Sequence, residues 1–300
     1  MKKFFFCAAA AIVALASCSK TQVVYNDTPQ EIGFKAVTGA ITKAEQTDAT
    51  LDGTMGVFAF VHDGATQYFV NKSFSKVSGT VWTATPSQYW PVTSGLDFAV
   101  YAPHQESGAS ATNTSLTVAT DNSENTAIDN QTDYLYGAAY YNNEGAGYNK
   151  NTTSVPVTLN HAQAKVTVSF TGENVTVTNV KLDTPVLKGS YTVDYSANTV
   201  KPVWTPGEAN SAVTLISTAE LTNAPATASL LVVPETTSTI TFSYKIKGSD
   251  ATLNHTITPA ADWAYGTEYV YNVTITPKEI KFTPEVSYGW ETGTTTGTTL

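Results

Sequence analysis

The spacing of apolar residues beyond residue 30 predicts a chain built almost entirely from short β-strands. The clearest segment alternates Ile240, Phe242, Tyr244 and Ile246 with polar residues. A period of two places one face of a strand against a core and the other face in water. Comparable segments recur at intervals of about 10 residues between Gly, Pro, Asn and Ser, which is typical of a β-sandwich.

Three segments depart from this simple alternation. Met55–Val61 is apolar on both faces, which predicts a central strand that is covered on both sides. Between Val175 and Leu182 the apolar residues change parity, which predicts a bulge near residues 178–179 or two separate strands. Residues 104–133 are rich in Ser, Thr, Asn and Asp and predict a mobile surface excursion.

The last apolar segment is unusually long. Its apolar residues share even parity: Ile280, Phe282, Pro284, Val286, Tyr288 and Trp290. A strand over these positions spans about 36 Å at about 3.3 Å per residue, roughly twice the usual length. It has more apolar edge than its own sheet needs, and Pro284 confines it to an edge or a bulge.

The N-terminus has the pattern of a lipoprotein signal peptide. Lys2 and Lys3 precede the apolar run Phe4–Ala16, and Leu15-Ala16-Ser17 leads directly into Cys18. The run has about 13 residues, fewer than a membrane-spanning helix needs. We therefore expect removal of residues 1–17 and lipid on Cys18, which anchors the chain without crossing the membrane. The alternative is a soluble secreted protein with an incidental cysteine.

Local composition divides the rest of the chain. Residues 18–30 are polar and predict a lipidated tether. The polar, Gly/Asn-rich stretch 142–154 predicts a boundary between an N-terminal β-sandwich (residues 31–154) and a C-terminal β-sandwich (residues 155–290). The Thr/Gly tail, residues 291–300, is expected to be disordered.

Charge and cysteine content exclude certain partners and a disulfide. The 16 basic residues are all lysine, and the net charge of −9 becomes about −11 without Lys2 and Lys3. This acidic balance argues against nucleic acid or an anionic lipid surface as a partner. Cys18 is the only cysteine after processing, so stability must come from the core and not from a disulfide.

The sequence contains no local motif for metal binding or catalysis. The four histidines lack metal-binding spacing, and the acidic residues Asp121, Glu124, Asp129 and Asp133 fail the calcium-loop pattern. Catalytic and phosphate-binding motifs are absent from the sequence, so we expect no enzyme, metal or cofactor, although distant positions could still assemble a Ser/His/Asp set. Aromatic residues could form either a sugar-stacking platform or ordinary core: Trp82, Tyr89, Trp90, Tyr134, Tyr136, Tyr140, Tyr141 and Tyr148.

Several stretches, in order along the chain, resemble the fimbrillin family, the type V pilins of Bacteroidetes and their lipoprotein relatives. They are Leu15 to Cys18; Ile32-Gly33-Phe34 with Thr42-Lys43-Ala44; Tyr89-Trp90-Pro91 with Leu96 to Pro103; Asp133 to Gly137; Leu159 to Val166; Leu231 to Pro234; and Trp263 to Tyr269 leading to Ile280-Lys281-Phe282 and Trp290. The resemblance implies two tandem transthyretin-like β-sandwich domains in an all-β protein.

The resemblance also implies a mode of assembly. The protein would be a lipoprotein of the cell outer membrane, and proteolysis at Lys43-Ala44 would remove its lipidated first strand, which carries Ile32 and Phe34. The vacated groove would then accept a strand from another pilin subunit. Relatives are often cut after arginine, which this chain lacks.

A short repeat suggests the donor in this exchange. Glu31-Ile32-Gly33-Phe34 and Glu279-Ile280-Lys281-Phe282 share Glu-Ile-x-Phe. We therefore expect the segment with Ile280, Phe282, Val286, Tyr288 and Trp290 to enter the groove of a neighbour, although Ile-x-Phe is also a common strand pattern. The alternative function is a monomeric surface lipoprotein that binds a glycan, or a host or bacterial protein, through exposed aromatic loops.

Overall fold

The computed structural model describes residues 28–38, 53–139, 147–197, 200–288 and 298–299. Within these ranges the regular structure consists of β-strands and one 3-10 helix, η1 (Ile128–Asn130), with no α-helix. The all-β prediction is therefore confirmed. The same part of the chain contains no helix with the length and hydrophobicity needed to cross a membrane.

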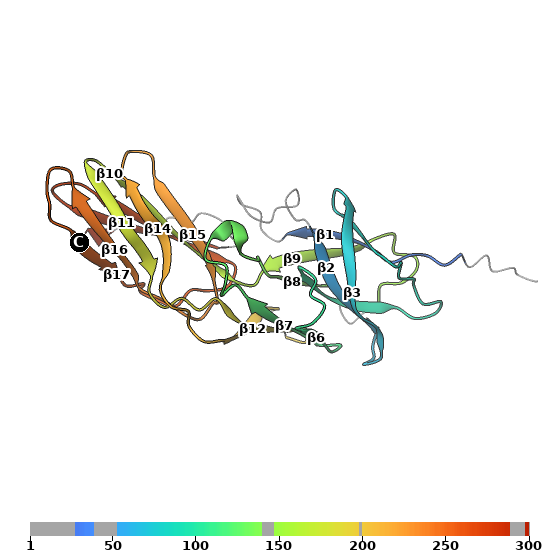
Figure 1. Cartoon of the computed structure of the whole chain (residues 1–300). Coiled ribbons are helices and arrows are strands. Elements are labelled where there is room, and N and C mark those ends of the chain that lie inside the picture. The colour runs from blue at the N-terminus through green and yellow to red at the C-terminus, as the bar shows by residue number, and fades with distance from the viewer. Residues whose placement is uncertain (1–27, 39–52, 140–146, 198–199, 289–297, 300) are drawn as a thin grey trace, which may run out of the picture.

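A closed β-barrel lies at one end of the molecule (Figure 1). In order around the barrel, its strands are β1 (Gly33–Thr38), β4 (Val81–Ala84), β3 (Gln67–Ser78), β2 (Thr54–Val61), β5 (Leu96–Ala102), β8 (Leu135–Ala139) and β9 (Val155–His161). The barrel interior is a continuous apolar core to which all seven strands contribute.

Strand β2 is central and covered on both faces, as its sequence predicts. Met55 and Val57 point into the barrel core, whereas Phe58 and Phe60 belong to a second core outside the barrel. Gly56 leaves room on this outer face for the Tyr101 ring, because a Cβ atom at residue 56 would lie 2.1 Å from that ring.

A four-stranded antiparallel sheet, which we call the outer sheet, covers the second core and joins distant parts of the chain. Its order is β13 (Pro202–Pro206), β12 (Lys188–Asp194), β7 (Ser115–Asp121) and β6 (Ala109–Ala111). The prediction of a mobile surface excursion over residues 104–133 is wrong, since β7 pairs with β12 over its whole length and buries Leu116 and Val118 completely. Two of its strands, β6 and β7, precede residue 154, and the other two, β12 and β13, follow it. A division of the chain at residue 154 therefore runs through this sheet.

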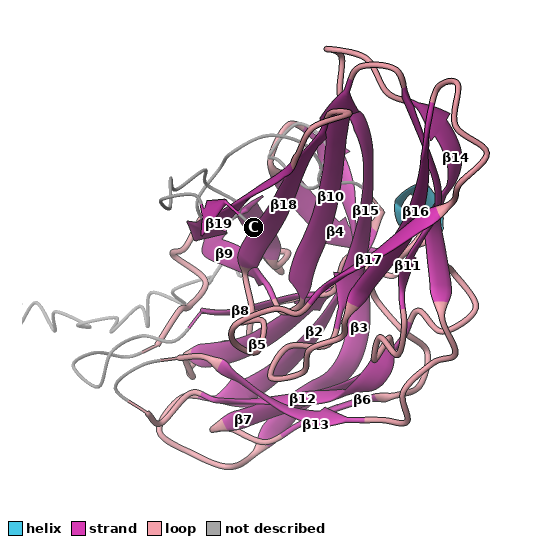
Figure 2. Cartoon of the chain, turned by 90° about the vertical axis from the view of Figure 1, so that its left-hand side faces the viewer, coloured by secondary structure: helices cyan, strands magenta, loops and turns pink. Residues whose placement is uncertain are grey.

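Two further sheets lie at the end opposite the barrel (Figure 1) and pack face to face as a sandwich (Figure 2). One has the order β15 (Ala226–Val232), β10 (Ala164–Gly172), β18 (Thr267–Ile275), β19 (Ile280–Tyr288) and β20 (Thr298–Thr299). The other has the order β14 (Val213–Glu220), β11 (Val175–Leu182), β16 (Ile240–Ile246) and β17 (Leu253–Ile257). The bulge predicted in β11 is confirmed, because its register to β16 shifts between Thr178 and Lys181 and Asn179 has φ 53°.

Side-chain hydrogen bonds link the outer sheet and the segments connected to it to neighbouring parts of the fold. The Trp204 indole donates to the carbonyl of Ala162 at 2.8 Å. The carboxamide of Gln131 bonds both the N–H and the carbonyl of Leu231, at 2.6 and 3.1 Å, at the edge of the sandwich. These bonds satisfy backbone groups that would otherwise be left unpaired at the junction.

Candidate functional site in the seat of strand β1

The candidate site is the position of β1 between β4 and β9, which we call the β1 seat. Strand β1 pairs in parallel with β9 from Phe34↔Val155 to Thr38↔Leu159. It pairs antiparallel with β4 over residues 33–35, where Phe34 lies opposite Trp82. The first strand of the described residues is therefore an internal strand that closes the barrel.

Apolar side chains fix β1 in the seat. Ile32, Phe34 and Ala36 are exposed by 1% or less. The Phe34 ring packs edge-on against the rings of Phe74 and Phe98, each with a centroid separation of 5.0 Å. Alternation along β1 sends these residues inward, and Lys35 between them is exposed.

Backbone hydrogen bonds extend the seat beyond the strand itself. The N–H of Trp90 donates to the carbonyl of Gln30 at 3.0 Å, and the N–H of Ile32 donates to the carbonyl of Gln88 at 2.7 Å. At the other end the N–H of Ala36 donates to the carbonyl of Thr80 at 3.1 Å. Residues 30–36 thus form backbone hydrogen bonds to residues between 80 and 90 along one side of the seat.

The seat can hold a strand in either direction, because β4 and β9 run antiparallel to each other. Any strand between them is parallel to one and antiparallel to the other, as β1 is. Without a strand in the seat, both β4 and β9 would expose unpaired backbone groups, which are a template for strand addition. The direction and identity of an occupant therefore depend on its side chains.

Four of the predicted site residues, for lipidation, for processing and for the donor strand, lie outside the described part of the chain. Cys18, Lys43, Ala44 and Trp290 all fall in the ranges left out of the structure. Lys43 lies between β1 and β2 in the sequence, so the chain that joins these strands contains the predicted cut.

The predicted donor segment forms β19 in the sandwich. It pairs antiparallel with β18 over its full length, from Ile275↔Ile280 to Thr267↔Tyr288. Ile280 and Phe282 are half-buried against the sandwich core, and the Phe282 ring stacks on Tyr271 at 5.9 Å and 12°. Val286 is also half-buried.

The two predicted halves of the exchange site are not brought together within one chain. Ile32 and Phe34 belong to the barrel core, whereas Ile280 and Phe282 pack on the separate core of the sandwich. A contact between these segments would require a second subunit.

Of the two alternatives for the aromatic residues, platform or core, the structure places four in the core. Trp82, Trp90, Tyr134 and Tyr136 are at most 7% exposed and fill the barrel core or the second core, so they cannot stack on a sugar from solution. Tyr89 is 44% exposed. Tyr140 and Tyr141 lie outside the described residues.

Two histidines have carboxylate partners within the fold. His62 Nδ1 lies 2.9 Å from Asp97 Oδ2, and His161 Nδ1 lies 2.9 Å from Asp133 Oδ2. Across the described ranges, no cluster of three or more His, Cys, Asp or Glu residues is arranged to hold a metal ion.

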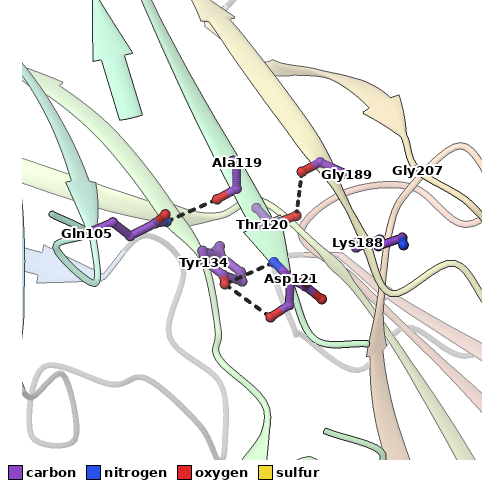
Figure 3. Close-up of a pocket in the computed structure, with 8 residues that line it drawn as sticks. All are labelled: Gln105, Ala119, Thr120, Asp121, Tyr134, Lys188, Gly189 and Gly207. Carbon is purple, nitrogen blue, oxygen red and sulfur yellow. Dashed lines mark hydrogen bonds between the residues drawn. The ribbon is translucent and has the colours of Figure 1, made fainter. Parts of the chain in front are cut away.

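A shallow cavity of about 390 Å³ lies beside strands β7 and β12 of the outer sheet (Figure 3). It is lined by Gln105, Ala119, Thr120, Asp121, Tyr134, Lys188, Gly189 and Gly207. Hydrogen bonds from Ser123 hold the pKa of Asp121 below its ordinary value, and burial raises the pKa of Tyr134. The Tyr134 hydroxyl accepts a hydrogen bond from the N–H of Asp121 at 3.1 Å, so this group already has a structural partner within the fold.

Sequence reasoning missed the walls of the β1 seat. Trp82 on β4 and Val155 on β9 face Phe34 in the register, yet they lie far from it along the chain. Alternation in each segment indicates a strand but does not indicate which strands pair. Only the shared apolar character of these segments could have suggested a common core.

Solved structures with the same fold come from Bacteroides. A proposed cell adhesion protein from Bacteroides uniformis matches with a TM-score of 0.58 and 16% identity, covering 86% of this chain and 99% of that one. A second, from Bacteroides ovatus, matches with a TM-score of 0.56 and 18% identity, covering 86% and 97%. At such low identity the likeness concerns the fold alone.

No curated protein matches the sequence. A family model described as fimbrillin-like matches residues 42–288, which is most of the chain. Proteins of this kind are structural components of cell-surface fimbriae and are not enzymes. The chain therefore belongs to the fimbrillin-like family.

Proposed function

We propose that this protein is a subunit or minor component of a cell-surface pilus, exported as a lipoprotein and assembled by donor-strand exchange in support of adhesion. Family membership supports a fimbrial role and an association with other fimbrial subunits. The observation that carries the exchange mechanism is the position of β1, an N-terminal strand that is buried between β4 and β9. In this proposal the barrel and the sandwich correspond to two transthyretin-like domains.

The proposed trigger is proteolysis after Lys43. A cut there would separate β1 and the lipid on Cys18 from the rest of the chain, since both precede Lys43. Loss of β1 would uncover the apolar seat that now buries Ile32 and Phe34. Burial of each such side chain is worth about 1.5–3 kcal/mol, so the opened seat would favour capture of another strand.

We propose β19 of a neighbouring subunit as the incoming strand. Its Ile280 and Phe282 repeat the spacing of Ile32 and Phe34. They are only half-buried in their own sandwich, so their transfer to a closed seat would bury further apolar surface. The backbone of β19 would supply the pairing with β4 and β9, and its alternate side chains would fill the pockets.

Substitutions on the two faces of β19 test this proposal. Combined Ile280→Asp and Phe282→Asp should abolish polymers, because two charges would have to enter the apolar seat. Lys281→Asp with Thr283→Asp is the matched control on the opposite face, and should leave polymers intact. The readouts are the ladder in unboiled detergent gels and the circular dichroism of the monomer. Polymers that persist in the first variant would rule out β19 as the donor.

The state of the protein on its own cells tests the trigger. We expect the N-terminal sequence and mass of surface material to correspond to a chain that begins at Ala44. A chain that still begins at acylated Cys18 would show that β1 is retained, and would favour an anchored protein over a processed subunit.

A further inference from the structure

The segment that leads into β1 and the segment that leads into β19 share more than the apolar residues of the two strands. Residues 28–34 and residues 276–282 both read Thr-Pro-x-Glu-Ile-x-Phe, in the same chain direction. Five of these seven positions are identical. The similarity therefore begins upstream of Ile32 and Ile280, in residues that precede the apolar part of each strand.

The first of these segments crosses the end of the barrel that is farthest from the sandwich. Strand β9 pairs in parallel with β1 and then leads into β10 of the sandwich, so the N-terminal end of β1 lies at the far end of the barrel (Figure 1). There the N–H of Trp90 donates to the carbonyl of Gln30 at 3.0 Å. Glu31 forms a β-bridge with Tyr89.

Three exposed apolar side chains border this segment, and we call the surface that they form the distal rim: Tyr68, Tyr89 and Val92. Tyr68 is 41% exposed and Val92 is 66% exposed, the highest value among the large apolar side chains of the described residues. The Tyr68 hydroxyl donates to the carbonyl of Tyr89 at 2.9 Å, so the two tyrosines are neighbours. Exposed apolar side chains that lie together are typical of a surface that binds a partner.

The second segment lies at the opposite end of the molecule. Strand β10 begins beside the barrel, and its last residue, Gly172, pairs with Ile275 at the end of β18. The turn formed by residues 276–279 therefore lies at the end of the sandwich that is farthest from the barrel (Figure 1). Its Pro277 and Lys278 are exposed.

The short connection between β18 and β19 limits where the body of a donor subunit can lie. Only residues 276–279 join the two strands, and four residues span at most about 14 Å. A subunit whose Ile280 takes the place of Ile32 must therefore hold the end of its sandwich against the distal rim. Its residues 278 and 279 then stand where residues 30 and 31 now pair with Trp90 and Tyr89.

We infer that the distal rim is a docking surface for a second copy of this chain, occupied by residues 276–279 and the adjoining sandwich end of the subunit that donates β19. The inference rests on the proposed function and adds a direction to it, because the donor then runs parallel to β9, as β1 does. The rim and the sandwich end lie at opposite ends of one chain (Figure 1). Such a heterologous contact stacks subunits barrel to sandwich and repeats without closing a ring.

The match between the two segments is concentrated at the rim end of the seat. A Cβ atom at Gly33 would lie 3.7 Å from the nearest atom, so a side chain such as that of Lys281 can be accommodated there. Farther along, Pro284 would stand in the place of Ala36, whose N–H donates to the carbonyl of Thr80. Proline has no N–H to donate, so the donor repeats the contacts of β1 best beside the distal rim.

Cross-linking between subunits tests this contact. Cys7 and Cys18 both precede the proposed cut after Lys43, so a processed chain carries only the thiols that are introduced. Val92→Cys and Pro277→Cys are combined in the full-length chain, which is expressed in its own cells and treated with a short bismaleimide. The matched control combines Val77→Cys with Pro277→Cys.

The control pair differs from the test pair in the end of the seat that it examines. Val77 is 60% exposed, like Val92, but it lies in the β3–β4 hairpin beside Thr80, at the end of the seat opposite the distal rim. A donor that entered the seat in the reverse direction would bring residues 276–279 to this hairpin. Each single-cysteine variant can form dimers at most, so a ladder requires both positions.

We expect a ladder of covalent multimers in boiled gels from the Val92/Pro277 pair, at least about tenfold stronger than from the Val77/Pro277 pair, because the assembled contact raises the effective concentration of the two thiols. A stronger ladder from the Val77/Pro277 pair would show that the donor enters in the reverse direction and would overturn the inference. Equal ladders, or none, from chains that still form polymers in unboiled gels would overturn it too and would leave strand exchange standing.

The native chain on unboiled gels separates this inference from the proposed function. If it forms no polymers while the Val92/Pro277 pair still cross-links, the docking of the rim on the sandwich end is supported and the exchange mechanism is contradicted. If it forms no polymers and neither pair cross-links, both are overturned.

Discussion

Strands β1 and β19 carry nearly the same short sequence but occupy different environments. In β1, Ile32 and Phe34 are almost completely buried, with a strand on each side. In β19, Ile280 and Phe282 are half-buried, and the strand has a full-length partner only in β18. The comparison teaches that Glu-Ile-x-Phe specifies an apolar strand face, while the surrounding topology decides how completely that face is covered.

The largest expected difference concerns the two phenylalanines. Phe34→Ala should lower the free energy of unfolding by about 3–5 kcal/mol, because a fully buried ring is lost from a closed core. Phe282→Ala should cost roughly 1–2 kcal/mol, since part of that ring already contacts water. Urea denaturation of both variants measures the two values. Equal losses would mean that the two environments are energetically alike.

Alkaline pH should destabilise the second core more than the region under β19. Burial raises the pKa of Tyr101, Tyr134, Tyr136 and Tyr191 in the second core behind β2 and β5, but only of Tyr271 under β19. The folded state then keeps protons that the unfolded state loses above about pH 10, so stability present below that pH is lost as pH rises. Four such tyrosines lie in the second core and one lies under β19, so the loss of stability above about pH 10 should be larger in the second core.

Methyl resonances of the two regions provide the measurement. Signals from Val57 on β2 should lose their native positions at a lower pH than those of Val273 on β18. Simultaneous loss of both sets would show that the two regions unfold as one unit.

Glycines in the two regions should respond oppositely to alanine. In Gly172→Ala the new Cβ would lie 2.3 Å from the carbonyl oxygen of Ile275, on the strand that leads to β19, and we expect a loss of about 1–3 kcal/mol. In Gly33→Ala the nearest atom would be 3.7 Å away, and reduced backbone entropy of the unfolded chain should stabilise β1 by about 0.5 kcal/mol. Thermal denaturation checks both signs. A destabilised Gly33→Ala would indicate that the seat is tighter than this geometry implies.

A single hydroxyl beneath β19 should make a modest contribution to stability. Tyr271→Phe removes the acceptor of the Trp263 indole and should cost about 1–2 kcal/mol, because it leaves a buried donor unpaired. The stack on Phe282 keeps its ring partner, so β19 should stay in place. Urea denaturation gives the cost, and a change in hydrogen-exchange protection of β19 would contradict the assignment of the effect to the hydroxyl alone.

The sequence predicts local structure well in this protein. Apolar residues on both faces of Met55–Val61 identify a central strand, and the parity change in Val175–Leu182 identifies the bulge at Asn179. Both features depend on side chains within a few residues of one another, so they can be recognised without knowing the partner strands.

The features that the sequence did not settle depend on distant partners. Leu116 and Val118 are too few to indicate a strand within a polar segment, yet β12 supplies the pairing that orders them. Trp82 and Trp90 have the composition of a binding platform, but the closure of the barrel by β1 buries them. The β1 seat could not be predicted for the same reason, since β9 becomes its wall only through a parallel pairing between remote segments.

The outer sheet also sets the order in which the chain can fold as it is synthesised. Thr117 on β7 bonds Thr192 on β12, 75 residues later. An emerging chain must hold the apolar residues of β7 without their final partner until β12 has followed, which makes completion of this half slow relative to a sheet of adjacent hairpins. The first half of the protein thus completes its second core only after β12 and β13 have been synthesised, and its maturation depends on the beginning of the second half.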